Sequence, residues 1–144
     1  MRGNPTNDDV ASELAARGLR ATRQRIAVLE LLRGSSAHPT ATNLHRQLLR
    51  SQPNVSLKTV YDALEVLVGA GLASCVTDGG APYRYEANIA PHYHALCRIC
   101  GSLLDVPARA DGHIRGRTPL PDGFDVDQIR VTLLGRCARC HDDL

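Results

Sequence analysis

The sequence predicts an α+β protein with two parts: a helical N-terminal half closed by a β-hairpin, and a smaller mixed half. Two observations lead to this prediction. Apolar residues recur at three-to-four spacing through the first half, and two Cys-x-x-Cys pairs lie near the two ends of the second. With 144 residues, the chain can hold one ordinary domain or two small ones. We expect one domain over residues 1–87 and another over residues 88–144.

Four helices are predicted in the first half. The first covers about residues 8–17, beginning in an Asn-Asp-Asp run and ending at a glycine. The second is capped by Thr22, and the third covers about residues 40–50. The fourth, over residues 56–69, begins at Ser56 and repeats apolar residues every three or four positions.

A predicted hairpin follows the fourth helix. Its first strand, turn and second strand cover residues 72–77, 78–82 and 83–87. Helices followed by a hairpin are typical of a winged helix-turn-helix, in which the last helix enters the major groove of DNA. Lys58, Thr59 and Tyr61 lie on the first turns of that helix, where recognition helices usually contact bases.

Charge gives weaker support for DNA binding. The formal net charge is only +2, but residues 17–33 hold five arginines against the single acid Glu30. Such a basic stretch suits contact with DNA phosphates. On charge alone a solvated helix face is the more common explanation, so the stretch counts only together with the predicted fold.

The second half mixes strand-like and loop-like stretches. Residues 93–106 and 124–134 are strand candidates, whereas the glycines and prolines of residues 107–123 allow only a short helix. A segment this small and loop-rich does not fold as an independent monomer without help. We expect zinc to join its two ends and a partner subunit to complete its core.

Four cysteines predict a closed structural zinc site: Cys97, Cys100, Cys137 and Cys140. Two knuckles with two-residue spacing supply the four thiolates that tetrahedral zinc prefers. A redox dithiol would not need a second copy of the pair, and the strand–knuckle–strand context fits zinc better than an iron–sulfur cluster. The fifth cysteine, Cys75, is expected to be a buried small hydrophobic residue.

Three histidines and two carboxylates are candidates for a second metal site: His38, Glu86, His92, His94 and Asp105. His92 and His94 are two residues apart, so a strand would place both imidazoles on one face. The mixed nitrogen and oxygen donors suit Fe(II), Mn(II) or Zn(II), and they favour iron or manganese over copper(I). If His38 joins ligands from the second half, the metal fixes the angle between the halves. In a dimer that angle sets the spacing of the two recognition helices.

Other classes of protein fit the sequence less well. No apolar run reaches the ~18 residues of a membrane-spanning helix, and the first ten residues lack the apolar segment of a secretory signal, so we expect a cytoplasmic protein. A metalloenzyme is disfavoured because the motifs H-E-x-x-H and G-x-S-x-G are absent, and five protein ligands would leave little room for a substrate. We therefore expect no small-molecule substrate. A zinc-stapled DNA-binding protein without a sensor is a third hypothesis.

Several stretches together resemble the ferric uptake regulator family, from about residue 10 to residue 141. They are G-L-R-A-T-R-Q-R at 18–25, H-P-T-A at 38–41, S-L-K-T-V-Y at 56–61, R-Y-E at 84–86, H-Y-H-A-L-C-R-I-C-G at 92–101 and G-R-C-A-R-C at 135–140. The resemblance implies a homodimer with an N-terminal winged helix and a C-terminal α/β dimerisation domain. The metal-loaded dimer would bind an operator in double-stranded DNA and repress transcription.

The resemblance also implies which residues act. Structural zinc would lie on the four paired cysteines, and a regulatory Fe(II) or Mn(II) on the three histidines and two carboxylates named above. DNA contacts are implied at the matching positions Arg20, Thr22, Arg25, Ser56, Lys58, Thr59 and Tyr61.

The H-Y-H run and Asp105 are similar to the peroxide-sensing branch of this family. In that branch Fe(II) reacts with hydrogen peroxide and oxidises a ligand histidine, which releases DNA; the matching candidates here are His38 and His92. Glu86 resembles the iron-sensing branch instead, so reversible iron or manganese sensing is the alternative. The sequence also departs from the family at Asp62, where many members carry arginine, which leaves the operator sequence open.

Overall fold

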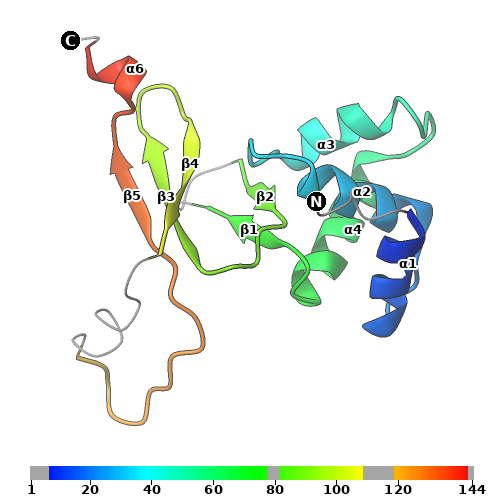
Figure 1. Cartoon of the computed structure of the whole chain (residues 1–144), viewed down its shortest axis with the longest axis horizontal. Coiled ribbons are helices and arrows are strands. Elements are labelled where there is room, and N and C mark those ends of the chain that lie inside the picture. The colour runs from blue at the N-terminus through cyan, green and yellow to red at the C-terminus, as the bar shows by residue number, and fades with distance from the viewer. Residues whose placement is uncertain (1–6, 78–81, 109–118, 143–144) are drawn as a thin grey trace. The chain divides into compact units, whose positions relative to one another are not determined.

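Figure 1 shows the chain as a computed structural model, which describes residues 7–77, 82–108 and 119–142. The chain divides into two compact units, Met1–Ile89 and Ala90–Leu144, called unit 1 and unit 2 below. Unit 1 is mainly helical, and unit 2 is built on a small mixed sheet. The predicted α+β class is confirmed.

Unit 1 contains the four predicted helices in the predicted order. They are α1 (Asn7–Ala16), α2 (Arg23–Arg33), α3 (Ala41–Leu48) and α4 (Leu57–Gly69). Every helix begins and ends within two residues of the predicted bounds where those were given. The agreement is close because the signals for starting and stopping these helices are local in the sequence.

Hydroxyl side chains cap three of the helices. Thr22 Oγ1 accepts a hydrogen bond from the backbone N–H of Arg25 at 3.2 Å, and Ser56 Oγ accepts one from Thr59 at 3.1 Å. Thr40 forms a reciprocal capping box at the start of α3. Caps of this kind contribute about 1 kcal/mol each. The helix starts are therefore fixed by the residues that the sequence marks.

The four helices share one aliphatic core. Its fully buried side chains come from every helix and from the residue that leads into the hairpin: Val10, Leu14, Val28, Leu29, Leu32, Leu44, Leu48, Val60, Leu64, Leu67 and Leu72. The core contains no tryptophan because the chain has none. It holds α4 with its apolar face inward, which leaves the opposite face of that helix exposed.

A hairpin completes the winged helix of unit 1. Strands β1 (Ser74–Val76) and β2 (Arg84–Glu86) pair antiparallel, as predicted, with Cys75 opposite Tyr85. The backbone N–H of Tyr85 donates to the carbonyl of Pro39 at 2.9 Å, and Thr40 forms an isolated bridge with Arg84. The second hairpin strand is thus tied to the segment that precedes α3. Most of the predicted turn, residues 78–81, lies outside the described residues.

Unit 2 contains a three-stranded sheet in the order β4-β3-β5. Strand β3 (His92–Cys97) pairs antiparallel with β4 (Leu103–Pro107) and parallel with β5 (Thr132–Gly135), and the short helix α6 (Ala138–His141) follows. The strands predicted over residues 93–106 are confirmed as β3 and β4.

The prediction of a strand over residues 124–134 is wrong for most of that range. The observed strand β5 begins only at Thr132, which lies opposite His94 of β3. Because β3 itself begins at His92, the residues before about 130 have no strand beside them in the described part of unit 2. Apolar alternation alone predicted a strand there, but a strand needs a partner. The short helix allowed within residues 107–123 falls mostly on 109–118, outside the described residues.

None of the helices within residues 7–77, 82–108 and 119–142 has the length and apolarity needed to cross a bilayer.

Candidate metal centres and nucleic-acid interface

Parallel pairing of β3 with β5 brings the two cysteine knuckles together. Cys97 ends β3 and lies opposite Gly135, the last residue of β5, two residues before Cys137. Gly101 closes the first knuckle with a positive φ of 75°, a conformation that glycine adopts without strain. The sulfur atoms of all four predicted cysteines lie within 4.8 Å of one another.

The spacing of the sulfurs fits a tetrahedral zinc ion. Zn–S bonds of about 2.3 Å at tetrahedral angles place neighbouring sulfurs about 3.8 Å apart. Cys100 Sγ and Cys137 Sγ are 3.7 Å apart. The cluster contains four cysteines and none of the His, Asp or Glu side chains of the described residues, which is the donor set of a closed structural site.

Hydrogen bonds prepare this cluster for a cation. Backbone N–H groups of Cys100 and Cys137 donate to Cys97 and lower the pKa of its thiol to about 6. The pKa of Cys140 is raised to about 12, first by its hydrogen bond with Cys137 and then by burial. Clustered thiols cannot all ionise without a cation to offset their charge, whereas metal binding requires thiolates. The fit to a divalent ion is therefore electrostatic as well as geometric.

A second cluster in unit 2 contains His92, His94 and Asp105. The Nε2 atoms of His92 and His94 are 3.1 Å apart, so both imidazoles lie on one face of β3, as predicted. Each Nε2 is 3.6 Å from Asp105 Oδ1. The antiparallel register of β3 and β4, with His94 opposite Asp105, creates this triangle of donor atoms.

The triangle has the dimensions of a metal-ligand set. Bonds of about 2.1 Å place neighbouring ligand atoms about 3.0 Å apart at an angle of 90° and about 3.6 Å apart at roughly 120°, and the three sides of the triangle lie within this range. The carbonyl of Ala90 lies 2.7 Å from His92 Nδ1 and accepts its proton, which leaves Nε2 with a lone pair for a metal. Two histidines and one carboxylate are the donor set of many Fe(II) sites.

The other two predicted ligands meet in unit 1. His38 Nε2 is 3.1 Å from Glu86 Oε2, and both side chains are buried. His38 has a φ of 49°, in the left-handed region. This is unusual because a residue that precedes a proline, as His38 precedes Pro39, favours extended conformations. The bonds from β2 to Pro39 and Thr40 hold this strained segment in place. Backbone strain of this kind is concentrated at functional sites.

The predicted DNA-contact residues lie at the starts of α2 and α4. Neither helix has an acidic residue in its first turn, whereas α1 has Asp8 and Asp9 there. Acids at a helix start stabilise the helix dipole. The first turns of α2 and α4 contain the basic residues Arg23, Arg25 and Lys58 in place of acids. These two helix starts are therefore positively charged, which suits contact with phosphate groups.

Several of these residues also have structural contacts. Thr22, Ser56 and Thr59 take part in the caps, and the Arg25 guanidinium donates to the carbonyl of Arg20 at 2.9 Å. Tyr61 is 46% exposed on the outer face of α4.

His45 has a partner that no motif in the sequence marks. Its Nε2 lies 2.8 Å from the carbonyl of Val55, the residue before the α4 cap, and the side chain is half-buried. No side-chain pattern marks a backbone carbonyl as a partner. Cys75, predicted to be buried, is half-buried and packs against the unit 1 core.

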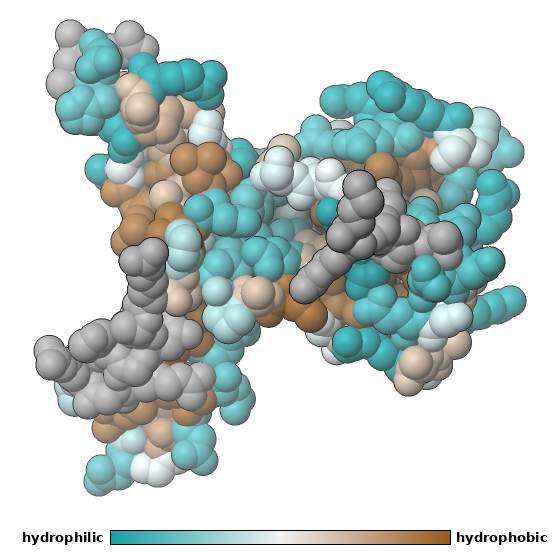
Figure 2. All heavy atoms as spheres, viewed as in Figure 1, coloured by the Kyte–Doolittle hydropathy of each residue, from teal (hydrophilic) through white to brown (hydrophobic). Residues whose placement is uncertain are grey.

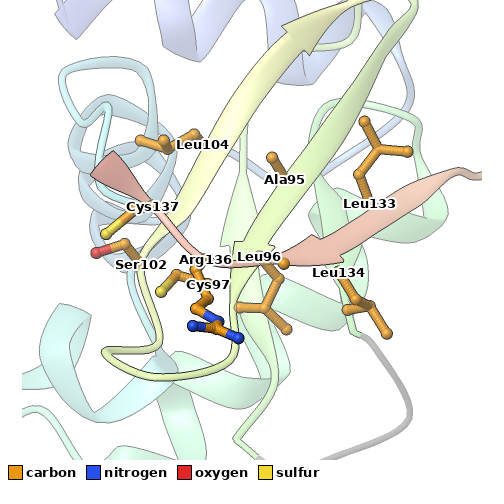
Figure 3. A pocket seen from close by; sticks show the side chains of 10 residues that line it. Ala95, Leu96, Cys97, Ser102, Leu104, Leu133, Leu134, Arg136 and Cys137 are labelled. Atoms are coloured by element: carbon orange, nitrogen blue, oxygen red, sulfur yellow. The ribbon is translucent and has the colours of Figure 1, made fainter. Parts of the chain in front are cut away.

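Apolar side chains reach the surface over the sheet of unit 2, as Figure 2 shows. Leu104, Leu133 and Leu134 are 52–55% exposed. Figure 3 shows the shallow hollow of about 220 Å³ beside them, lined by Ala95, Leu96, Cys97, Ser102, Leu104, Leu133, Leu134, Gly135, Arg136 and Cys137. Leu104 lies on the edge strand β4, and Leu133 and Leu134 lie on the other edge strand, β5. Exposed leucines on edge strands are unusual for a surface that faces only water.

A winged helix followed by a sheet with a thiolate cluster and a histidine–carboxylate cluster defines a metal-binding winged-helix protein. The sequence model of the Ferric uptake regulator family matches residues 16–133, and the chain belongs to this family of regulators. The resemblance noted in the sequence is thereby confirmed.

Two curated relatives and one solved structure illustrate the similarity. The chain is 37% identical over 123 residues to the peroxide operon regulator of Bacillus subtilis (strain 168), covering 85% of each chain. It is 32% identical over 135 residues to the peroxide-responsive repressor PerR of Staphylococcus aureus (strain Mu50), covering 94% of this chain and 91% of the relative. The structure of the Helicobacter pylori ferric uptake regulator Fur matches with a TM-score of 0.77 at 18% identity, covering 99% of this chain and 98% of that one, which supports the fold alone.

Proposed function

We propose that this chain is a metal-dependent repressor that binds operator DNA as a homodimer and releases it after reaction with hydrogen peroxide. The observation that carries the proposal is the triangle of His92, His94 and Asp105, whose donor set suits Fe(II) or Mn(II). Similarity to peroxide-responsive repressors over most of the chain supports the choice of signal. As a DNA-binding regulator it would act in the cytoplasm, without a small-molecule substrate and without catalytic turnover.

Zinc on the four cysteines holds unit 2 together, and a separate ion acts as the switch. Fe(II) and Mn(II) prefer six ligands, so the three donors of unit 2 leave coordination positions open on the ion. We assign two of these positions to His38 and Glu86 of unit 1. His92 is only six positions after Glu86, a span of at most about 21 Å, so the chain itself limits the distance between the two ligand sets.

An ion with ligands from both units couples metal binding to DNA affinity. The boundary between the units falls between Ile89 and Ala90, within the stretch that joins Glu86 to His92. Binding by ligands on both sides of this boundary favours one arrangement of the units over others. In a dimer that arrangement sets the distance between two α4 helices, which must fit half-sites one helical turn apart.

Peroxide would reverse this coupling by damaging a ligand. Fe(II) held by these ligands would supply the activation of hydrogen peroxide. The imidazole of His38 or His92 would then gain one oxygen atom at a ring carbon and lose two electrons to the peroxide, whose second oxygen atom would leave as water. An oxidised imidazole is a poorer ligand, so the ion is lost and the units are no longer held in the DNA-binding arrangement. Mn(II) would support DNA binding without this reaction.

DNA contact is assigned to the starts of α2 and α4. Arg20, Arg25 and Lys58, with the caps Thr22 and Ser56, surround helix starts that lack acidic residues. Thr59 and Tyr61 lie on the first turns of α4 and would reach base edges. Anions are favoured at such helix starts for two reasons. The helix dipole is positive there, and the first backbone N–H groups have no acceptor within the helix.

A second copy of the chain is assigned to the apolar surface of unit 2. Leu104 and Leu133 lie on either side of Ala95 on one face of the sheet, and a partner sheet packed on that face would remove them from water. Leu134 lies on the other face, at the edge of the sheet, where an added strand would cover it.

Metal dependence of DNA binding tests this proposal. Duplexes selected from a random pool by the Mn(II)-loaded protein serve as the probe, and affinity is measured with and without Mn(II). His94→Ala should abolish the effect of Mn(II) while zinc content stays unchanged. His141→Ala is the matched control, because His141 is exposed and lies outside both clusters. Equal DNA affinity of the apo and Mn(II)-loaded wild type would refute the switch.

A further inference from the structure

The exposed face of α4 carries an ion pair that neither the metal centres nor the core explains. Lys58 Nζ donates to Asp62 Oδ2 at 2.8 Å, one helical turn apart. Their side chains are 83% and 58% exposed. The opposite face of α4, with Val60 and Leu64, is buried, so the pair lies on the side of the helix that is open to a partner.

Helix stability does not account for the pair. Exposed pairs one turn apart add little to stability, and the order found here, lysine before the acid, is the weaker one. Lys58 also lies in the first turn of α4, where the helix dipole disfavours a cation. Contact between the exposed face of α4 and a binding partner explains the positions of both charges better.

The two charged groups offer opposite hydrogen-bonding capacity side by side. Lysine can only donate, and an ionised aspartate can only accept. In the major groove a G·C base pair presents guanine O6 and N7 as acceptors beside the N4 amino donor of cytosine. Guanine O6 and cytosine N4 are bonded to each other and lie about 2.9 Å apart. The Lys58 and Asp62 groups, 2.8 Å apart, match this spacing.

An A·T pair fits the two groups less well. Its amino group, adenine N6, has an acceptor on each side, N7 of adenine and O4 of thymine, and both repel a carboxylate. The cytosine amino group has an acceptor on one side only. A carboxylate next to a lysine therefore prefers the edge of a G·C pair.

We propose that Asp62 is a specificity-determining residue, which with Lys58 reads one G·C base pair in each half-site; this rests on the proposed function, in which α4 enters the major groove. Asp62 accepts from the cytosine N4 amino group, and Lys58 donates to O6 or N7 of the paired guanine. The carboxylate also repels phosphates, so it weakens contact with wrong sequences and raises specificity at some loss of affinity.

Selection from a random-core duplex pool tests the proposal with the Mn(II)-loaded dimer. Wild type should enrich a G·C pair at one position of each half-site, and an A·T pair there should lower affinity roughly 5- to 150-fold, the discrimination of a good side-chain contact with a base. Asp62→Asn should lose this preference and keep the others. Glu65→Gln is the matched control, since Glu65 is an exposed acid on the same helix that we do not assign to a base.

Each outcome decides something different. If Asp62→Asn discriminates like wild type at every position, the inference is wrong. Loss of all DNA binding by Asp62→Asn with an unchanged melting temperature would also overturn it, because removing a carboxylate should ease contact with phosphates. Asp62→Ala provides the same readout if the asparagine variant does not fold. If wild type enriches no sequence at all, the proposed function fails and this inference fails with it.

Discussion

Breaking the cysteine cluster should unfold unit 2 and leave unit 1 folded. In the described part of unit 2, the buried residues are Leu103 and two cysteines of the cluster itself, Cys97 and Cys140. A fully buried leucine contributes roughly 1.5–3 kcal/mol, whereas a structural zinc site contributes about 10–16 kcal/mol. Because whole domains have net stabilities of about 5–15 kcal/mol, the loss of zinc removes more than unit 2 can spare. Unit 1 has its own aliphatic core and no part in the cluster.

The change to make is Cys137→Ser, with Cys75→Ser as its control. Both replace one sulfur by oxygen, but Cys75 lies on β1 of unit 1, outside the cluster. Hydrogen exchange read by mass spectrometry, with zinc content measured on the same samples, should report lost protection in β3, β4 and β5 of the Cys137 variant only. Helices α2 and α4 should keep theirs. Intact protection of β3 in zinc-free protein would refute the reasoning.

Three further predictions concern single side chains. Glu86→Gln should weaken Mn(II) binding by at least tenfold in calorimetry without changing zinc content, since even outer-shell partners of a metal contribute about 10- to 100-fold. Thr40→Ala removes the capping box of α3 and should cost about 1 kcal/mol of unit 1 stability in chemical denaturation. The Glu13 pKa is lowered by its hydrogen bond with Arg33. The pair therefore stabilises the fold above the unfolded pKa of glutamate, and this contribution is lost as pH falls through the lowered folded value. The stability difference between wild type and Glu13→Gln should shrink between about pH 7 and about pH 3.

Each of these predictions has a result that would contradict it. Unchanged Mn(II) affinity in Glu86→Gln would remove Glu86 from the regulatory site. A Thr40→Ala variant as stable as wild type would mean that the cap bond is replaced by water at no cost. A stability difference for Glu13→Gln that grows towards low pH would reverse the sign derived from the ion pair.

The helices and the cysteine cluster could be predicted because their signals are local or chemically specific. Thr22 and Ser56 mark helix starts through one hydrogen bond three residues ahead, so the sequence contains both partners. The two Cys-x-x-Cys pairs specify four thiolates whatever the strands between them do. The spacing of His92 and His94 likewise predicted that both rings lie on one face.

Features that depend on distant partners could not be predicted. The length of β5 is set by where β3 begins, and the sequence of β5 does not contain that information. His45 bonds a backbone carbonyl, and His38, with its left-handed φ, directly precedes the two residues that bond to β2. The Lys58–Asp62 pair was present in the sequence at helical spacing, but only the exposure of that face gives it meaning.

Operator binding before and after stoichiometric hydrogen peroxide, on protein loaded with Fe(II) or with Mn(II), tests the central claim most directly. Intact mass and peptide mapping are recorded on the same samples. The account predicts that only the iron form loses DNA, with one added oxygen atom mapped to His38 or His92. Retained binding and unchanged mass in the iron form would contradict peroxide sensing and favour a reversible iron or manganese regulator.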